Sequence, residues 1–457
     1  MALVDRIEDG TARICVLGLG YVGLPLAVCL AEVGYTVTGL DTDRKKVDAL
    51  LRGSSYILDV SGETVARLTA AGKLQATTDY DILKGMDVVF ICVPTPFDAM
   101  KAPDLSDIVS AATGIARRLQ LGQLIILQST TYPGTTEEKV LPILEQSGLR
   151  AGRDFHLAFS PERINPGDKV YHVGNLPKVV GGLTPQCADL AERLLKKLSP
   201  LVHVVSSPRA AEMSKLLENI FRSVNIALVN ELALLSERMG IDIWEVIRAA
   251  ATKPFGFMPF YPGPGTGGHC IPVDPYYLSW KAREYDFYTK FIELAAEVNQ
   301  SMPYHVVELV TRGLGLNGRP LRGAQVLVLG VAFKKDVDDP RNSPAERIIE
   351  LLLDRGAAVS YNDPYVTAFR VGHSVFYRQE VKLTSQPLCE SLLQQADCVV
   401  VVAGHSCYDC TWIAQHCSLL VDTVNATRGI QDAKARIVRL GAPQEMGPQA
   451  SLGDSVV

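Results

Sequence analysis

Apolar residues recur with two different periods along the chain. From Arg13 to about residue 207, short apolar runs such as RICVLG, DVVFICVP and QLIILQST alternate with helical patterns. Short apolar runs between glycine or proline turns are typical of buried parallel strands, and their alternation with helices is typical of a sheet covered on both faces. The first stretch therefore predicts an α/β domain over residues 1–207.

The pattern becomes helical from about Pro208. Apolar positions spaced by three and four run through PRAAEMSKLLENIFRSVNIALVNELALLSERMG, and Gly240 follows as a helix cap. A second helical run extends from about Phe287 to Gly313. We expect residues 208–313 to form a central helical region with one long helix and, between the two runs, a glycine-rich loop.

A second alternation of strands and helices follows. GAQVLVLGVAFKKDVDDPRNSPAERIIELLLDRGAAVSYNDP predicts strand, loop, helix and strand, and ADCVVVVAGH and CSLLVDTVN add strands. The predicted fold class is α/β, with two Rossmann-like, doubly wound domains joined by the helical region. The second of them would span residues 314–440, and residues 441–457, which have no periodicity, would form a flexible tail.

Composition narrows the function. The 457 residues are 47% hydrophobic and 21% charged, with a formal net charge of −5, which is typical of a globular protein. A slightly acidic chain gives no electrostatic reason to expect nucleic acid or membrane as a partner. The N-terminal residues do not resemble a targeting signal and no apolar run is long enough to span a bilayer, so a cytoplasmic protein with a small-molecule partner is predicted.

Ten cysteines are spread over the whole length. In a cytosolic chain this pattern predicts reduced thiols and not a disulfide framework. Zinc ligands could come from one local group, His405, Cys407, Cys410, His416 and Cys417. Structural zinc sites have a second ligand pair at a regular spacing, which this group lacks, so we expect no metal.

A glycine motif, GLGYVG, follows the first predicted strand and opens a helix, and Asp41 ends the next strand. The glycines would allow a tight turn and let a pyrophosphate reach the helix N-terminus, and Asp41 would bond ribose hydroxyls but repel a 2′-phosphate. The alternative is a tight turn without a ligand. The motif predicts NAD as cofactor, bound by Gly18, Gly20, Tyr21, Val22, Gly23 and Asp41.

Later strands of the same sheet end in two further turns, Pro94-Thr95-Pro96 and Ser129-Thr130-Thr131. An open α/β sheet binds its ligand at such strand ends, so we expect both turns to shape the nicotinamide side of the site.

Cys270 lies in GPGTGGHCIPVDP, a segment too rich in glycine and proline to continue a helix or a central strand. Another molecule can approach closely to a glycine backbone. Cys270 is therefore a candidate nucleophile, and the alternative is a plain turn with an incidental cysteine.

The long helix carries Lys215, Asn219 and Arg222 on one face, because they are four and three residues apart. Most such triplets form a solvated stripe. Here the neighbouring residues are largely apolar, so we expect a partly buried cationic face directed at a site.

Five segments occur in the order found in the UDP-glucose/GDP-mannose dehydrogenase family, which this chain resembles over nearly its whole length. They are GLGYVG with Asp41, SPERINPGD, the helix with Lys215 and Asn219, GGHCIPVDP, and FKKDVDDPRNSP. Within the family, SPERINPGD, the cysteine loop and the long helix are most similar to the branch that oxidises UDP-N-acetylglucosamine at C6. The resemblance implies oxidation of the C6 alcohol of a UDP-sugar to a carboxylate with two NAD, through a thioester on Cys270.

The resemblance also implies roles for single residues. Glu162 would be the base for thioester hydrolysis, and Thr130 would support the attacking water and the cofactor. Lys215, Asn219 and Asp274 would hold the C6 oxygen. Further implied cofactor contacts are Lys46, Thr95, Thr130 and Arg341. The implied substrate contacts are Glu162, Arg163, Lys215, Asn219, Arg222, Tyr261, Gly267, Phe333 and Lys334.

Two departures from the family pattern concern the substrate. Asp422-Thr423-Val424 has valine where many relatives have an arginine, which is missing here or replaced by Arg428. TKPFGFM lacks an arginine that the UDP-glucose branch tends to carry. The aromatic stretch from Phe255 to Tyr261 is expected to help line a pocket for the acetyl group; the alternative is that it packs the helical region.

Several alternatives stay open. UDP-glucose or UDP-N-acetylmannosamine could be the substrate. A β-hydroxyacid dehydrogenase would leave Cys270 and the second α/β stretch unexplained, and an NAD-binding sensor would leave the candidate catalytic groups unused. The resemblance also implies a homodimer or higher homo-oligomer formed through the long helix.

Overall fold

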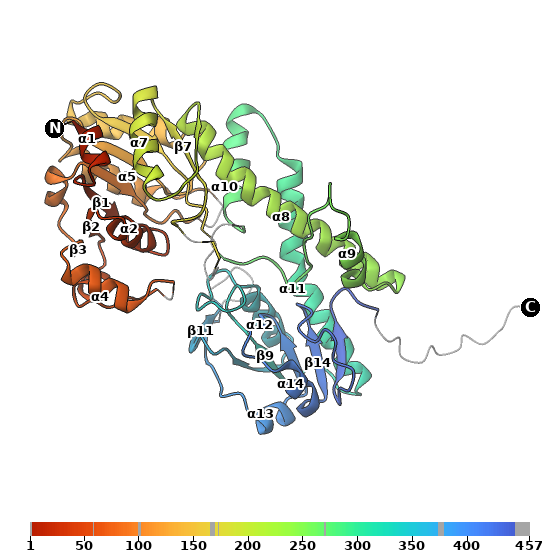
Figure 1. Cartoon of the computed structure of the whole chain (residues 1–457). Coiled ribbons are helices and arrows are strands. Elements are labelled where there is room, and N and C mark those ends of the chain that lie inside the picture. Colours follow the sequence, from red (N-terminus) through yellow and green to blue (C-terminus); the bar gives the residue numbers. More distant parts are fainter. Residues whose placement is uncertain are drawn as a thin grey trace, which may run out of the picture. The chain divides into compact units, whose positions relative to one another are not determined.

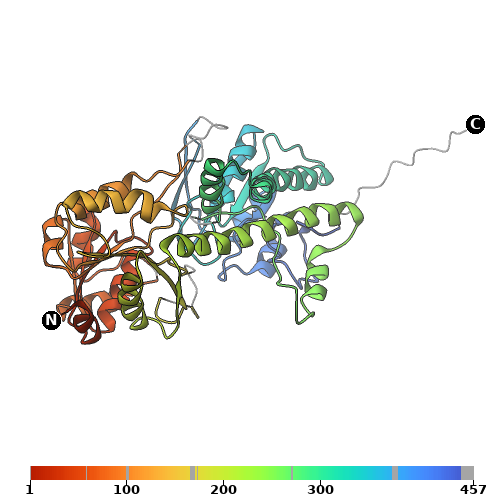
Figure 2. The ribbon, with the colours of Figure 1, turned by 90° about the horizontal axis from the view of Figure 1, so that it is seen from above.

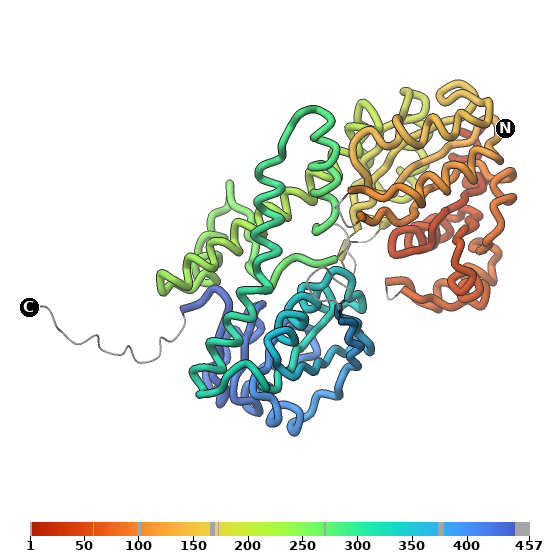
Figure 3. Tube along the Cα trace, turned by 180° about the vertical axis from the view of Figure 1, so that it is seen from behind, coloured from red at the N-terminus to blue at the C-terminus, as the bar shows by residue number. Residues whose placement is uncertain are grey.

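The structure is a computed structural model that describes residues 2–57, 59–98, 102–164, 170–171, 173–268, 271–372 and 379–443. The chain divides into two compact units, Met1–Ile220 with Val273–Tyr288, and Phe221–Pro272 with Thr289–Val457. The long helix α8 (Pro208–Met239) passes from the first unit to the second, and α10 (Asp274–Ala282) belongs to the first. Figure 3 follows this path along the trace.

An eight-stranded sheet forms the first unit, in the order β3-β2-β1-β4-β5-β6-β7-β8 (Figure 1). Neighbouring strands are parallel except β6 and β7. The strand order reverses between β1 and β4, and such a switch point is where doubly wound sheets bind ligands. The strands are β1 (Arg13–Leu17), β2 (Thr36–Leu40), β3 (Leu74–Thr77), β4 (Val88–Ile91), β5 (Leu124–Leu127), β6 (His156–Phe159), β7 (Lys178–Gly182) and β8 (Val202–Val205).

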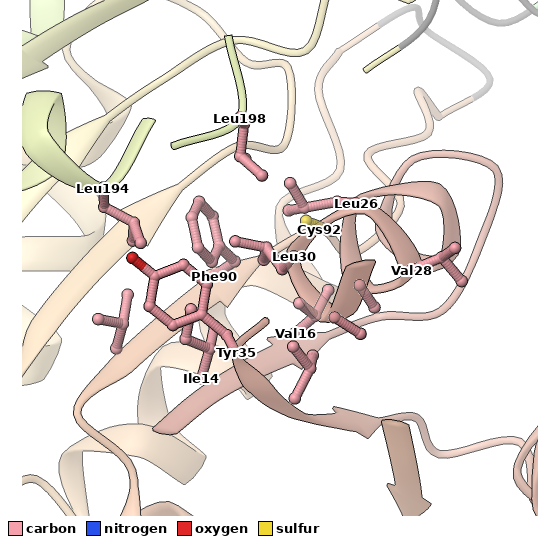
Figure 4. Packing of buried hydrophobic residues seen from close by; sticks show 14 of the residues in the cluster. Ile14, Val16, Leu26, Val28, Leu30, Tyr35, Phe90, Cys92, Leu194 and Leu198 are labelled. Carbon is pink, nitrogen blue, oxygen red and sulfur yellow. The ribbon is translucent and has the colours of Figure 1, made fainter. Parts of the chain in front are cut away.

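Both faces of this sheet are buried, as the apolar runs predict. In β1, Ile14 and Val16 join one core, whereas Cys15 and Leu17 join the other. Figure 4 shows part of the first core, where Tyr35 and Phe90 lie among side chains of β1 and of the helices. Five helices contribute to this core: α1 (Leu3–Glu8), α2 (Gly23–Glu32), α3 (Arg44–Leu51), α4 (Gly62–Ala70) and α7 (Pro185–Lys196). Two cover the opposite face: α5 (Ser106–Ala116) and α6 (Leu141–Leu144).

The second unit contains a parallel five-stranded sheet in the order β10-β9-β13-β14-β15, with its switch point between β9 and β13. Val326 and Val328 of β9 face one core, and Leu327 and Leu329 face the other. The strands are β9 (Gln325–Leu329), β10 (Ala358–Asn362), β13 (Cys398–Val401), β14 (Leu419–Asp422) and β15 (Arg436–Arg439), with a separate hairpin of β11 (Ala368–Val371) and β12 (Val381–Thr384). The helices are α9 (Ile243–Ala250), α11 (Lys290–Leu316), α12 (Pro344–Asp354), α13 (Glu390–Gln395) and α14 (Cys410–His416).

The part of α8 in the second unit has an exposed apolar stripe. Phe221, Leu228, Leu232, Leu235 and Met239 are all exposed, and their spacing of seven, four, three and four residues places them on one face of the helix. Figure 2 shows this helix along its length, in yellow-green. An apolar face of this kind is consistent with contact to another chain. The homodimer stays a prediction.

The predicted α/β fold class is confirmed: two doubly wound sheets and the long helix are present. The structure divides the chain into two units, and the boundaries at residues 207, 313 and 440 stay predictions. The tail after residue 443 lies outside the described residues. Among those that are described, every helix is too short or too polar to cross a membrane.

Candidate active site

The glycine turn between β1 and α2 requires glycine for steric reasons. A Cβ on Gly18 would lie 2.6 Å from the carbonyl oxygen of Cys92, and one on Gly23 would lie 1.8 Å from that of Gly18. The space beside Gly20 is open to 4 Å, and Val22 makes no side-chain cap to α2 within the described part of the chain. The turn therefore fits a diphosphate, which would accept hydrogen bonds at the helix N-terminus.

Asp41 is buried directly against this turn. Its Oδ2 accepts hydrogen bonds from the backbone N–H of Leu19 at 2.8 Å and from the Lys46 ammonium at 3.0 Å, and its Oδ1 accepts from the N–H of Asp43. The carboxylate is thus fixed at the C-terminal end of β2, where a ribose hydroxyl would meet it. These residues fit NAD. Lys46, a predicted cofactor contact, forms an ion pair with Asp41.

The turns after β4 and β5 are joined to each other and to α10. The Thr95 hydroxyl donates to the carbonyl of Thr130 at 2.8 Å, and the Tyr277 hydroxyl donates to the carbonyl of Thr95. Val273 and Tyr277 pack against Tyr132. The first turn of α10, which follows the cysteine loop in sequence, is therefore held against the strand ends of the first sheet.

Three predicted catalytic residues are buried in the first unit. Lys215 and Asn219 come from α8, and Asp274 begins α10. The Asn219 amide donates to Asp274 Oδ2 at 2.5 Å. A hydrogen bond between two buried polar side chains thus joins the long helix to the end of the cysteine loop. Buried polar groups need such partners.

Arg222 is the exposed member of the cationic face that was predicted to be partly buried. Lys215 and Asn219 are buried. The first unit contains α8 only up to Ile220, and Arg222 belongs to the second unit.

Glu162 forms a buried ion pair with Lys178. Their side chains are 4% and 1% exposed, and the Lys178 ammonium lies 3.1 and 3.0 Å from the two carboxylate oxygens. Oε2 also accepts from the Gln128 amide at 2.9 Å, and Oε1 accepts from the backbone N–H of Arg163 and Ile164. These donors satisfy both oxygens of the buried carboxylate.

Glu212 joins α8 to the segment that follows Thr130. Its carboxylate accepts hydrogen bonds from the backbone N–H of Gly134 and Thr136 and from the Thr136 hydroxyl. Burial raises the pKa of Glu212 to about 7, although these hydrogen bonds oppose the shift. The predicted Thr130 turn is therefore anchored to α8 three residues before Lys215.

The cysteine loop is described up to Gly268; His269 and Cys270 lie outside the described residues. A Cβ on Gly267 or Gly268 would lie 2.9 Å from the Phe333 side chain. The Gly268 carbonyl accepts from the Asn342 amide at 3.0 Å. Glycine is required at both positions because Phe333 occupies the space beside them, and at Gly267 the carbonyl oxygen of Asn342 is as close, at 2.8 Å. The sequence did not reveal these neighbours.

The other predicted substrate and cofactor residues have protein partners. Arg163 forms an ion pair with Glu218 of α8 at 2.6 Å, and Arg341 pairs with Asp339 at 2.7 Å. Tyr261 stacks on Trp244 in the second unit. Lys334 is half-buried in the segment after β9. Arg428, the candidate replacement for the missing arginine, is exposed.

Comparison with known proteins gives three matches along the chain. Residues 12–199 match the NAD binding domain, residues 209–301 the central domain and residues 327–429 the UDP binding domain of the UDP-glucose/GDP-mannose dehydrogenase family. The chain belongs to this family. It is an oxidoreductase of the UDP-sugar dehydrogenases, and the predicted cofactor, NAD, is confirmed by the matched domain.

Relatives in the family differ in their named sugar. The chain is 41% identical over 358 residues to UDP-N-acetyl-D-glucosamine 6-dehydrogenase of Pseudomonas aeruginosa, covering 78% of this chain and 83% of the relative. It is 36% identical over 394 residues to UDP-N-acetyl-D-mannosamine dehydrogenase of Pyrococcus horikoshii, covering 86% and 89%.

Solved structures of the family share the fold. A UDP-D-ManNAc dehydrogenase from Pyrococcus horikoshii aligns with a TM-score of 0.84 at 33% identity, over 94% of this chain and 99% of the other. A UDP-glucose dehydrogenase from Pyrobaculum islandicum aligns with a TM-score of 0.83 at 28% identity, over 95% and 98%.

Sequence reasoning missed three residues that support this dehydrogenase site. They are Gln128, Lys178 and Glu212. Lys178 gave a detectable signal, since a lysine opens the apolar strand KVVGG. Glu212 gave a weaker one, because an acidic residue on a helix is usually solvated.

Proposed function

We propose that this protein oxidises the C6 alcohol of UDP-N-acetyl-D-glucosamine to the carboxylate in two steps, through a thioester on Cys270. The observation that carries the proposal is the buried group of Lys215, Asn219 and Asp274. Asp274 follows Cys270 by four residues and is hydrogen-bonded to the helix that carries Lys215. A lysine, an amide and a carboxylate together suit an alcohol or aldehyde oxygen whose charge changes during reaction.

NAD, when bound, accepts the hydride that leaves C6 in each of the two oxidations. In the first, C6 loses the hydride and its hydroxyl proton, and Lys215 and Asn219 hold the oxygen of the resulting aldehyde. The Cys270 thiolate then forms a bond to C6 as the C6–oxygen π bond opens onto the oxygen, and the resulting alkoxide adduct loses a second hydride to leave a thioester.

Hydrolysis completes the reaction. Water adds to C6, Glu162 takes a proton from it, and the C6–sulfur bond breaks to release the acid and the thiolate. One water and two NAD⁺ are consumed, and two NADH, one carboxylate and three protons are formed. Lys178 supports this role because its ammonium holds both oxygens of the Glu162 carboxylate in place.

The choice of sugar rests on the relatives and on one aromatic segment. Relatives named for UDP-N-acetyl-D-glucosamine are 41% and 37% identical to this chain. In the segment from Phe255 to Tyr261, Phe255 and Met258 are exposed, while Phe260 packs edge-on against Phe221. The exposed members supply apolar surface that an acetyl group could cover.

Steady-state kinetics test the sugar. We expect kcat/KM for UDP-N-acetylglucosamine to exceed that for UDP-glucose by about 10- to 100-fold, because partners of the acetamido group stay unpaired when the hydroxyl sugar binds. UDP-N-acetylmannosamine and UDP-N-acetylgalactosamine are compared in the same assay. Higher kcat/KM for UDP-glucose than for every acetamido sugar would overturn the assignment; a preference for UDP-N-acetylmannosamine would overturn the choice among acetamido sugars.

A further inference from the structure

The segment after β9 is held at both ends by one buried pair, His405 and Asp363. At its start, the backbone N–H groups of Val331 and Ala332 donate to Asp363 Oδ2 at 2.8 and 3.0 Å. At its end, the backbone N–H of Asp336 donates to His405 Nδ1 at 2.9 Å. Phe333 and Lys334 lie between these two anchors.

The pair lies at the switch point of the second sheet. Residues 331–336 follow β9 and His405 follows β13, which are the strands between which the order reverses. Asp363 follows β10, the other neighbour of β9. The segment therefore occupies the edge at which open α/β sheets bind ligands.

The hydrogen bonds assign one ring nitrogen of His405 as acceptor and the other as donor. Nδ1 accepts from the Asp336 N–H, so Nε2–H donates to Asp363 at 3.1 Å. Both side chains are 0% exposed, and the rings of Tyr365 and Tyr408 contact the imidazole edge-on. Burial opposes ionisation of Asp363, but the hydrogen bonds from His405 and the backbone lower its pKa below the ordinary value.

Asp336 adds a second tie between the segment and β13. Its carboxylate accepts from the N–H and the hydroxyl of Ser406 at 2.7 and 2.6 Å. Its φ of 60° is in the left-handed region, which an aspartate adopts when surrounding bonds hold it there. The end of the segment is thus held in a conformation that it would not favour when free.

We propose that His405 is a positioning residue for the UDP-sugar: by holding Asp336, it fixes residues 331–336 so that Lys334 is presented to the nucleotide sugar. This inference rests on the proposed function and on the substrate contact that the family resemblance implies for Lys334. Lys334 and Lys335 are adjacent in the segment, and a lysine ammonium attracts a diphosphate as a point charge. Fixing the segment before binding removes the loss of backbone freedom that binding would otherwise entail.

Two amide substitutions separate the two bonds of His405. In His405→Asn the amide oxygen lies near the Nδ1 position and still accepts from Asp336. In His405→Gln the amide nitrogen lies near the Nε2 position and still donates to Asp363, but the Asp336 N–H loses its acceptor. His416→Gln is the matched control, since His416 lies on α14 and its Nδ1 faces the carbonyl of Trp412 on the same helix.

We expect His405→Gln to raise KM for the UDP-sugar about tenfold, the size of one lost buried hydrogen bond, with kcat and KM for NAD within about twofold of the unmodified protein. His405→Asn and His416→Gln should keep KM near the original value. Partial unfolding cannot produce this result, because it lowers kcat through the active fraction and leaves KM unchanged.

Titration calorimetry with UDP measures binding without turnover. Among the three variants, only His405→Gln should show a higher Kd for UDP. Unchanged KM and Kd in His405→Gln, or an equal rise in the Asn and Gln variants, would overturn the inference. Failure of the unmodified protein to oxidise any UDP-sugar is a different result: it contradicts the proposed function, while the UDP titration still decides the role of His405.

Discussion

Cys270→Ala is expected to lower the rate of sugar-acid formation about 1000-fold or more, which corresponds to a barrier increase of ~4 kcal/mol. Without the sulfur, the aldehyde from the first oxidation has no covalent route to a thioester. NAD and UDP-sugar should still bind, because the groups proposed to bind them are intact. The measurement is the amount of uronic acid formed over time, with NADH release recorded in the same sample.

Cys389→Ala is the matched control for the thiol, because Cys389 is exposed and lies outside the proposed site. It should form acid at the original rate. If Cys270→Ala also forms acid at nearly that rate, the covalent mechanism is wrong, whatever the sugar.

Lys178→Met is expected to destabilise the first unit by about 3–5 kcal/mol, because it leaves the buried Glu162 carboxylate without its cation. For a unit of this size the melting temperature should fall by about 6–20 °C. Methionine retains most of the volume of the lysine stem, so the loss comes from the charge. The measurement is thermal unfolding of the protein without ligands.

Two further variants isolate the charge in that experiment. Lys178→Met combined with Glu162→Gln removes both charges and should recover much of the lost stability. Lys196→Met, in an exposed pair with Glu192, should change stability by about 0.5 kcal/mol or less. A Lys178→Met protein that melts as high as the Lys196→Met control would contradict the account of Glu162.

Much of the fold could be predicted because it depends on local periodicity. The apolar runs that predict strands after Arg13 and before Asp41 correspond to β1 and β2, and the helical pattern that stops at Gly240 corresponds to α8. The glycine turn was predictable because its motif, GLGYVG between a strand and a helix, is itself short. Its steric cause is partly long-range, since a Cβ on Gly18 would meet the carbonyl oxygen of Cys92, which follows β4.

The remaining features depend on contacts between distant positions. Glu162 pairs with a lysine on the next strand, and His405 pairs with Asp363, which lies 42 residues earlier. The sequence groups His405 with nearby cysteines as a candidate zinc ligand. The partner that determines its chemistry, Asp363, directly follows β10, and no periodicity reveals that pairing.

The glycine loop before Cys270 shows the same limit. The sequence predicts that another molecule approaches the glycine backbone, and this stays a prediction. The structure places Phe333 of this chain against Gly267 and Gly268. The glycines in the sequence predict that space is needed beside this loop. Only the folded structure identifies Phe333 as the residue that occupies it.

The proposed reaction is a four-electron oxidation, and counting the NADH formed for each UDP-sugar tests it most directly. A limiting, known amount of UDP-N-acetylglucosamine is consumed to completion with excess NAD, and NADH is read by its absorbance while the remaining sugar and the acid are quantified. We predict two NADH for each UDP-sugar consumed, with one uronic acid formed. One NADH for each sugar, with an aldehyde or ketone as the product, would contradict the account.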